Sequence, residues 1–161
     1  MPSLSANNLV GTAGEYYVCA ELCRRGYLAL MTPKNNPLFD VVATTKDGTK
    51  SISIQVKTRS VHNNQGWKLG ADITSEGKAK SLYVVLVNLR ETEAPEFYVY
   101  GRMELAKRVQ AVYDAYMGKP KKDGKERKAV AFRWFDEISF TEDDKSRKND
   151  WSRIVSALSA A

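Results

Sequence analysis

Two polar side chains with chemical potential lie close together on one predicted strand. The segment 51–60 alternates between apolar and polar residues, which is the period of a half-buried strand. Ile52, Ile54 and Val56 take one face, and Gln55 and Lys57 take the other. At roughly 3.3 Å per residue, Gln55 and Lys57 project side by side about 7 Å apart. An amide oxygen beside a lysine can help to bind a cation and to position a water molecule.

An isolated carboxylate precedes this pair in the chain. Asp40 is the only charged residue of the strand predicted over 38–44, and a lone carboxylate in an apolar run is costly unless it is paired or binds a metal. Asp47-Gly48 is typical of a two-residue hairpin turn, so this strand and the next are expected to be neighbours. Asp40 then approaches Gln55 and Lys57 across the ladder.

The third piece is a glutamate on the first predicted helix, 8–25, which Gly26 ends. At about 100° per residue the helix shows one apolar stripe, made of Leu9, Ala13, Tyr16, Ala20 and Cys23. Glu15 lies elsewhere on the helix, and its angular neighbours are Gly11, Val18, Cys19 and Leu22. A glutamate among such residues, directly after Gly14, is expected to point towards the interior.

Glu15, Asp40, Gln55 and Lys57 together form a candidate catalytic cluster. Two carboxylates and an amide oxygen suit a hard cation such as Mg²⁺ or Mn²⁺, with the Val56 carbonyl and water completing the shell. Lys57 would orient an attacking water and offset phosphate charge. This combination favours metal-assisted hydrolysis of a phosphodiester.

The order and spacing of these residues resemble the PD-(D/E)XK nuclease superfamily. The matching elements are Gly14-Glu15 on a helix, Phe39-Asp40 on a strand and Gln55-Val56-Lys57 on the next strand. The segment from about 8 to 60 is similar in order to archaeal Holliday-junction resolvases. Glutamine in place of the usual glutamate is similar to Mrr-like restriction enzymes and to an intron-encoded homing endonuclease of this fold.

The resemblance implies that the four residues bind divalent metal and position water, and that cleavage leaves 5′-phosphate and 3′-hydroxyl ends. The sequence departs from the pattern in two ways. Gln55 removes one negative charge, which weakens cation binding, and Pro37 lies three residues before Asp40, so the Pro-Asp dipeptide is absent. By analogy with the family, we also expect a homodimer, because two active sites cut two strands.

The predicted fold is α/β, with a restriction-endonuclease-like core in which a central mixed β-sheet is flanked by helices. The predicted order is α-β-β-β-β-β-α, built from these segments: 8–25, 27–32, 38–44, 51–60, 82–87, 97–100 and 103–117. The segment 62–80 is polar and is expected to be a long loop. The 161 residues fit a single domain, 1–161, with its core over about 8–117 and a strand and helix in an extension over 129–161.

Net charge points to a polyanionic partner. The chain carries 25 Lys and Arg against 19 Asp and Glu, a formal charge of +6. The basic loop 118–128 and the residues just after it hold most of this excess. The predicted nucleic-acid contacts are Arg59, His62, Trp67, Lys68, Lys119, Lys121 and Lys122, with Trp67 stacking on a base and the lysines following phosphates.

Structural explanations stay open for these residues. Gln55 and Lys57 also fit the solvent face of an edge strand, and Asp40 fits a buried acid satisfied by backbone donors. Glu15 and Lys57 could form a structural salt bridge. Arg59 and His62 also fit solvated surface positions, Trp67 a core position, and the basic run a solvated loop.

The leading hypothesis is therefore a metal-dependent DNA endonuclease. The alternative is a non-catalytic nuclease-fold module that binds nucleic acid or protein, and a weaker third is an assembly protein with a buried salt-bridge network. One histidine and the lack of a Cys-x-x-Cys motif give little support to zinc-finger or His-triad chemistry. No apolar run reaches the roughly 18 residues of a membrane helix, no signal peptide is visible, and two cysteines four apart fit a cytoplasmic protein.

Overall fold

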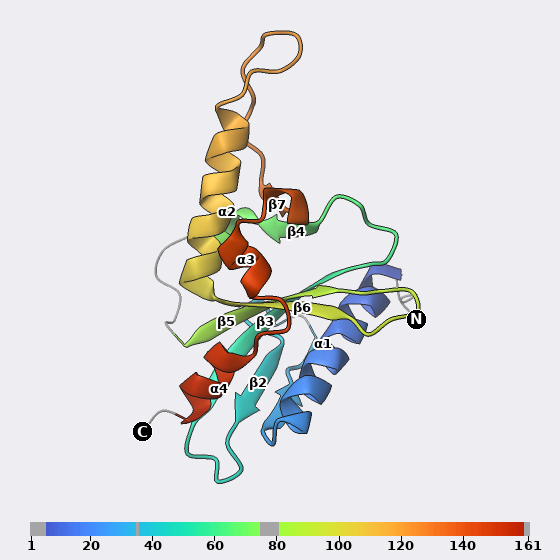
Figure 1. Ribbon diagram of the computed structural model, residues 1–161, viewed down its shortest axis with the longest axis vertical. Helices are drawn as coiled ribbons and strands as arrows, with labels where there is room; N and C mark the ends of the chain where they lie inside the picture. The colour runs from blue at the N-terminus through green and yellow to red at the C-terminus, as the bar shows by residue number, and fades with distance from the viewer. Residues whose placement is uncertain (1–5, 35, 75–80, 160–161) are drawn as a thin grey trace.

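The computed structural model describes residues 6–34, 36–74 and 81–159, and Figure 1 shows the arrangement of its elements. Its helices are α1 (Ala6–Arg24), α2 (Arg102–Met117), α3 (Glu142–Ser146) and α4 (Ser152–Ser159), with short 3₁₀ turns η1 (Ala71–Thr74) and η2 (Glu137–Ser139). Its strands are β1 (Leu28–Met31), β2 (Val41–Thr44), β3 (Ser51–Arg59), β4 (Trp67–Gly70), β5 (Leu82–Asn88), β6 (Glu96–Gly101) and β7 (Phe132–Phe135). Within these ranges, no helix is both long and apolar enough to cross a membrane.

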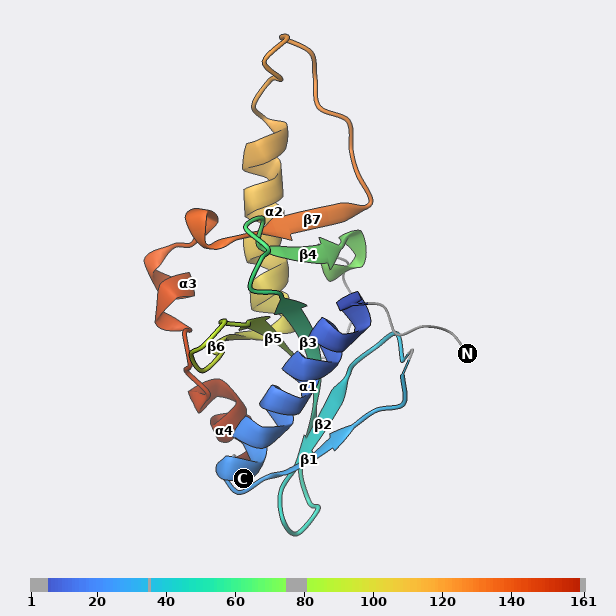
Figure 2. The same ribbon diagram turned by 90° about the vertical axis from the view of Figure 1, so that its right-hand side faces the viewer.

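A five-stranded mixed sheet forms the centre of the fold, in the order β1-β2-β3-β5-β6. β1, β2 and β3 pair antiparallel, β3 pairs with β5 in parallel, and β6 returns antiparallel to β5. Helices lie on both faces of the sheet (Figure 2). The predicted α/β class, with a central mixed sheet flanked by helices, is confirmed.

Each face of the sheet has its own apolar core. The even-numbered residues of β3, including Ile54 and Val56, pack with Val18 and Leu22 of α1 and with α4. The opposite face carries a second core, in which β5 and β6 pack against α2 and the small β4–β7 sheet. The odd-numbered Gln55 and Lys57 of β3 therefore lie on the face opposite α1 at this point of the sheet.

Two local predictions were wrong. The segment 62–80 contains β4 and η1 in addition to loop, because Trp67 and Leu69 alternate into the second core and pair with a strand more than 60 residues away; its residues 75–80 lie outside the described part. The β2–β3 connection is a loop over 45–50 and not a two-residue turn, since the ladder ends at Thr44 and Ser51. Gly48 has a φ of 71°, which glycine adopts without strain, so this residue still makes the reversal.

The C-terminal extension is built into both cores. Phe135 belongs to the core beneath α2, and Trp151 and Ile154 belong to the core beneath α1. It holds two helices, α3 and α4, and its strand β7 begins at Phe132, later than the predicted 129.

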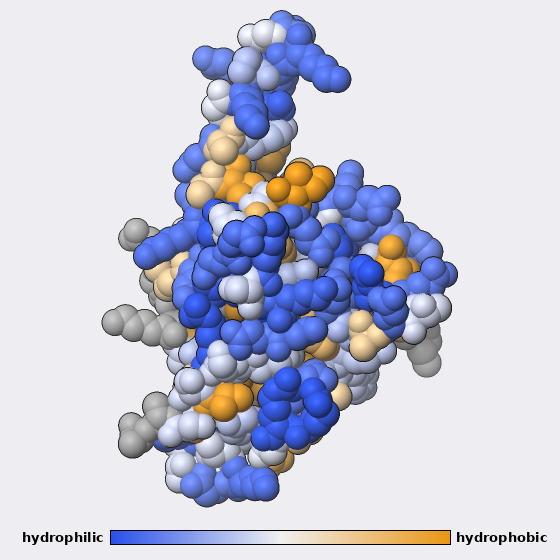
Figure 3. All heavy atoms as spheres, viewed as in Figure 1, coloured by the Kyte–Doolittle hydropathy of each residue, from blue (hydrophilic) through white to orange (hydrophobic). Residues whose placement is uncertain are grey.

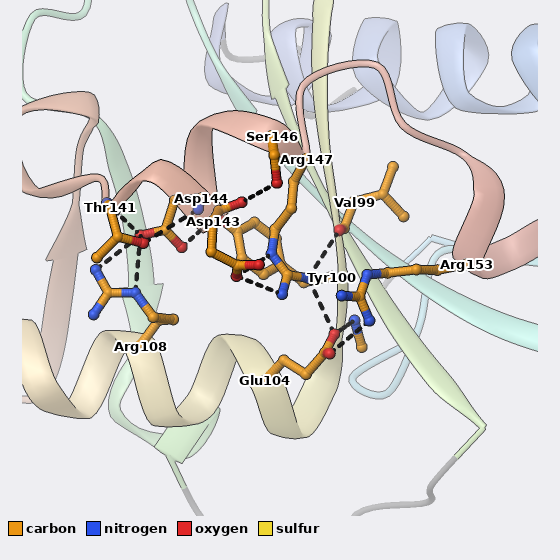
Figure 4. Close-up of polar contacts among 11 residues, drawn as sticks. Val99, Tyr100, Glu104, Arg108, Thr141, Asp143, Asp144, Ser146, Arg147 and Arg153 are labelled. Carbon is orange, nitrogen blue, oxygen red and sulfur yellow. Dashed lines mark hydrogen bonds and ion pairs between the residues drawn. The ribbon is translucent and has the colours of Figure 1, made fainter.

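A charge network fastens α3 to β6 and α2 (Figure 4). Fully buried Asp144 accepts hydrogen bonds from the Tyr100 hydroxyl at 3.0 Å and from Arg108 Nε at 2.8 Å. Arg147, one turn further, joins Asp143 and Glu104. The last segment of the chain is therefore held to the sheet by specific ion pairs as well as by apolar packing.

Candidate active site

The site lies where β2 and β3 separate. β2 begins at Val41, opposite Ile54, and Asp40 immediately precedes it. The Asp40 backbone N–H donates to the Ile54 carbonyl at 2.9 Å, which is the last backbone bond between these two strands. Two residues further along β3, Val56 N–H donates instead to the Asp40 Oδ2 atom at 2.7 Å. The Asp40 carboxylate thus takes the place of a backbone acceptor and is fixed beside Gln55, Val56 and Lys57.

The pKa of Asp40 shows which other charged side chains lie near it. Burial raises the pKa of Asp40 above its ordinary value, and the Val56 hydrogen bond opposes this. The nearby Glu15 carboxylate raises the pKa further, while Lys57 and Lys34 lower it. Asp40 therefore lies within electrostatic range of three other charged side chains, one from α1, one from β3 and one from the loop after β1.

Glu15 reaches the site because α1 approaches β3 very closely. A Cβ atom at Gly14 would lie 1.9 Å from the Thr58 hydroxyl oxygen, so only glycine fits there. That hydroxyl is buried and has no hydrogen-bond partner among the described residues, as expected for a position set by backbone contact. The close contact places the next residue, Glu15, at the rim of the site with its side chain 16% exposed.

The buried face of α1 is the face that carries Glu15, and the predicted apolar stripe was wrong. Gly14, Val18 and Leu22 are buried, whereas Leu9 is 55% exposed and Tyr16 is 63% exposed. Hydropathy alone favoured the stripe with more aromatic and aliphatic atoms. The face with Gly14 is buried instead, because at that residue the helix backbone lies close to the sheet.

We expect the variant Gly14→Ala to lose both stability and function. The added methyl must push α1 away from β3, at a cost of about 1–3 kcal/mol, and Glu15 moves with the helix. Gly11→Ala is the matched control, because a Cβ there meets nothing within 4 Å and should stabilise the helix by about 0.5–1 kcal/mol. Urea unfolding of both variants measures the difference. Equal stability of the two variants would show that the close approach does not exist.

Lys34 is a member of the site that the sequence did not reveal. Its Nζ atom donates to Glu15 Oε2 at 2.8 Å and to Thr12 Oγ1 at 2.8 Å, and its side chain is 60% exposed. Glu15 therefore pairs with Lys34, and not with Lys57 as the salt-bridge alternative supposed. A lysine in a Pro- and Asn-rich loop has no periodicity, so no sequence pattern connects it to a helix 19 residues away.

Gln55 and Lys57 share a face of β3 and are both partly buried, as the alternation predicted. β2 and β5 flank their strand, but its ladder with β2 ends at Ile54, so Gln55 and Lys57 are paired with β5 alone. The edge-strand alternative is therefore wrong for β3 as a whole and holds locally at these two positions. The alternative in which backbone donors satisfy Asp40 holds for one of its carboxylate oxygens, which accepts from Val56 N–H. The second oxygen, Oδ1, takes no part in that bond.

The two acids of the candidate site suit a hard divalent cation. Glu15 and Asp40 supply oxygen atoms, which Mg²⁺ and Mn²⁺ prefer, and a carboxylate desolvated next to another carboxylate gains from a cation between them. Gln55 adjoins Asp40 in the strand pairing but lies on the face of β3 that points away from α1. In the described part of the chain no three His, Cys, Asp or Glu side chains come together as a metal-binding group. With two carboxylates, the candidate site falls one acid short of such a group, and Lys34 offsets part of its charge.

Two of the predicted nucleic-acid contacts, Trp67 and Arg59, were wrong because both side chains are buried. Trp67 is 1% exposed, and its indole N–H donates to the Val87 carbonyl, so it is a core residue and cannot stack on a base. Arg59 is also buried, since its guanidinium stacks on Trp67 and is bonded to Asn88 and Glu137. Its guanidinium pairs with Glu137 and so holds η2 to the sheet.

The other predicted contacts lie on the surface. His62, Lys68, Lys119, Lys121 and Lys122 are exposed, and the Lys68 ammonium lies 4.5 Å from the centre of the Phe132 ring. These residues stay candidates for binding nucleic acid. They are spread over the β3–β4 loop, β4 and the basic loop, so they do not belong to the cluster around Asp40.

Comparisons with known proteins give structural similarity without sequence similarity. The sequence matches no family model and no curated protein. In structure, the chain is similar to the bacterial homing endonuclease I-Ssp6803I, with 14% identity, 93% of this chain and 92% of that chain covered, and a TM-score of 0.48. It is also similar to Hjc, a Holliday junction resolvase of the archaeal hyperthermophile Archaeoglobus fulgidus, with 16% identity, coverages of 81% and 86%, and a TM-score of 0.44.

Proposed function

We propose that this protein is a metal-dependent DNA endonuclease that hydrolyses phosphodiester bonds. The observation that carries the proposal is the junction of β2 and β3, where the Asp40 carboxylate is fixed on Val56 N–H, within electrostatic range of Glu15, Lys57 and Lys34. The charges come from segments far apart in the chain, and the two acids are partly buried, whereas the Lys34 side chain is 60% exposed. Partly buried acids next to lysines are typical of a catalytic site.

Each residue has a distinct role in the proposed reaction. Asp40, Glu15 and Gln55 would hold Mg²⁺ or Mn²⁺, with the Val56 carbonyl as a further oxygen ligand. The cation, when bound, polarises a phosphoryl oxygen and acidifies water. Lys57 orients the attacking water and offsets the charge that builds up on the phosphate. Cleavage of the DNA strand would leave a 5′-phosphate and a 3′-hydroxyl.

Cleavage of plasmid and end-labelled duplex DNA by the purified protein tests this proposal. We expect cutting with Mg²⁺ or Mn²⁺, none with EDTA, and products that a DNA ligase reseals, because ligase needs a 5′-phosphate. DNA bound without being cut under either metal would favour the second candidate, a non-catalytic module that binds nucleic acid or protein. Gln55 favours that candidate, since an amide at this position lowers the negative charge available to a cation.

Lys34 is expected to compete with the metal ion. Its ammonium already occupies one Glu15 oxygen at 2.8 Å, so a cation must displace it to bind that oxygen and meets its positive charge at the other. Lys34→Met should therefore bind Mn²⁺ about two- to five-fold more tightly, the range for a mostly exposed ion pair. Lys46→Met, an exposed lysine on the β2–β3 loop, should leave Mn²⁺ affinity unchanged. Weaker binding by Lys34→Met would show that this lysine helps to assemble the site.

Dimerisation and a cytoplasmic location are part of the same proposal. β1 is an edge strand, and two of its side chains, Leu28 and Leu30, are 49% and 56% exposed. An edge with exposed leucines is a surface on which a second copy can pair. Sedimentation of the purified protein shows whether it does.

A further inference from the structure

A narrow arm projects from the sheet on the side of α2 (Figures 1 and 2). It consists of α2 and the chain over 118–131, which returns to β7. Hydrophilic side chains cover its tip, and hydrophobic ones gather where it joins the body (Figure 3). The arm is therefore charged at its end and apolar at its base.

A cavity of about 480 Å³ lies between α2 and β7 at the base of the arm. Its walls carry four aromatic rings, two cations and one acid, contributed by Tyr113, Tyr116, Phe132, Trp134, Lys128, Arg133 and Asp136. Its volume falls within the roughly 300–1,000 Å³ of small-ligand sites. Aromatic faces framed by cations fit a flat, anionic ligand.

Two arginines beside the cavity, Arg127 of the arm and Arg133 of β7, stack on tyrosines and form no ion pair with an acid in the described part of the chain. The Arg127 guanidinium lies 4.0 Å from the centre of the Tyr116 ring and bonds its hydroxyl, and Arg133 lies 3.5 Å from the centre of the Tyr113 ring. Within the described ranges, the only ion pair inside the segment 118–131 joins Lys125 to Asp123 at 3.7 Å, whereas Glu104 and Arg108 near the start of α2 pair with the C-terminal segment. Most of the positive charge of the segment 118–131 is thus left for an external anion.

The aromatic rings of the cavity and the cations of the arm together favour one class of ligand. An apolar helix from a partner would bring no negative charge to offset the cations. A duplex would bring phosphates, but its base faces are already stacked and cannot enter the cavity. A single strand offers both a phosphate chain and free base faces, and proteins bind it with aromatic platforms in positively charged grooves.

We propose that the cavity binds an unpaired base of single-stranded DNA, while the basic loop 118–128 holds the adjoining phosphates. This inference rests on the proposed function, to which it adds a substrate class: DNA with unpaired nucleotides near the cleavage site, as at a branch or gap.

Binding measured in EDTA tests the inference separately from cleavage. The probes are a fluorescein-labelled oligothymidine of about 12 nucleotides, within known single-strand site sizes, and a blunt duplex of equal length. The protein should bind the single strand more tightly than the duplex. Tyr116→Ala should weaken single-strand binding at least about 5-fold, since stacking on one ring is worth about 1–3 kcal/mol, and should leave duplex binding unchanged.

Two further variants make the result specific to the ring. Tyr116→Phe keeps the aromatic face and should bind like the unmodified protein. Tyr17→Ala is the matched control, because Tyr17 on α1 is 46% exposed and Tyr116 is 51% exposed. The inference is overturned by any of three results: equal binding of single strand and duplex, unchanged binding by Tyr116→Ala, or a dimer that Tyr116→Ala dissociates. A protein that passes this test but cuts no DNA would refute only the proposed nuclease activity.

Discussion

Asp40→Asn is expected to reduce DNA cleavage by about 100- to 1,000-fold or more while leaving the fold intact. The substitution removes the charge that would hold a cation, and charge stabilisation of this kind is commonly worth that factor. Asparagine keeps an oxygen that can accept the hydrogen bond from Val56 N–H, so the start of β2 should stay in place. Single-turnover cleavage of a labelled duplex in Mg²⁺ measures the effect, with circular dichroism as the check on folding.

Asp47→Asn is the matched control for this prediction. Asp47 is also an aspartate next to β2 and β3, but it lies exposed on the connecting loop. Hydrogen bonds from Thr45 and Thr49 lower the pKa of Asp47 to about 2, so it is ionised wherever the assay is run. Its removal should not change the cleavage rate. Equal rates for Asp40→Asn and Asp47→Asn would remove Asp40 from the mechanism.

The largest effect on stability is expected at Asp144. Its carboxylate is fully buried and accepts bonds from Tyr100, Arg108 and Thr141, so its removal leaves the buried Tyr100 hydroxyl and the partly buried Arg108 without this partner (Figure 4). Asp144→Ala should lower the free energy of unfolding by about 3–5 kcal/mol. Asp143→Ala, at the neighbouring and largely exposed aspartate, should cost about 1 kcal/mol or less. Urea unfolding of both variants at neutral pH gives the two values.

The pH dependence of this effect has a definite sign. Burial raises the pKa of Asp144, but hydrogen bonds from the Thr141 backbone and Arg108 outweigh burial and hold the pKa below its ordinary value of 3.8. A carboxyl with a lowered pKa in the folded state stabilises the protein above pH 3.8 and loses that contribution as pH falls through the lowered value. The difference between Asp144→Ala and the unmodified protein should therefore shrink in acid. A constant difference would show that the carboxylate charge is not what Asp144 contributes.

The central sheet was predictable because its strands carry local signals. The alternation over 51–60 and the apolar run over 82–87 depend only on the period of a strand, and both strands are present within one residue of the predicted bounds. The first helix was found from the glycine that ends it, Gly26. Its buried face was not, because a close approach at Gly14 depends on Thr58 from a strand more than 40 residues later.

The second core escaped prediction for a similar reason. Trp67 stands in a polar, glycine-containing segment, so the sequence left open whether it stacks on a base or packs in the core. Its burial depends on β7, which pairs with β4 from the far end of the chain. Non-local pairing of two short strands leaves no periodic signal in either strand alone, and Arg59 was misplaced with Trp67 because the two side chains stack.

Asp40, by contrast, could be identified from the free-energy cost of an unpaired carboxylate in an apolar run. A lone charge in an apolar strand requires a partner, and the structure supplies one in Val56 N–H. Lys34 could not be found in this way, since an exposed lysine in a loop costs nothing. The acids of the site could thus be read from the sequence, and the cation that balances Glu15 required the fold.

Calorimetric titration with Mn²⁺ tests most directly whether the junction of β2 and β3 is a metal site. We expect saturable binding to the unmodified protein and to Asp47→Asn, and none to Asp40→Asn. Heat that does not saturate, or equal affinity for the protein with and without the Asp40 carboxylate, would contradict the account.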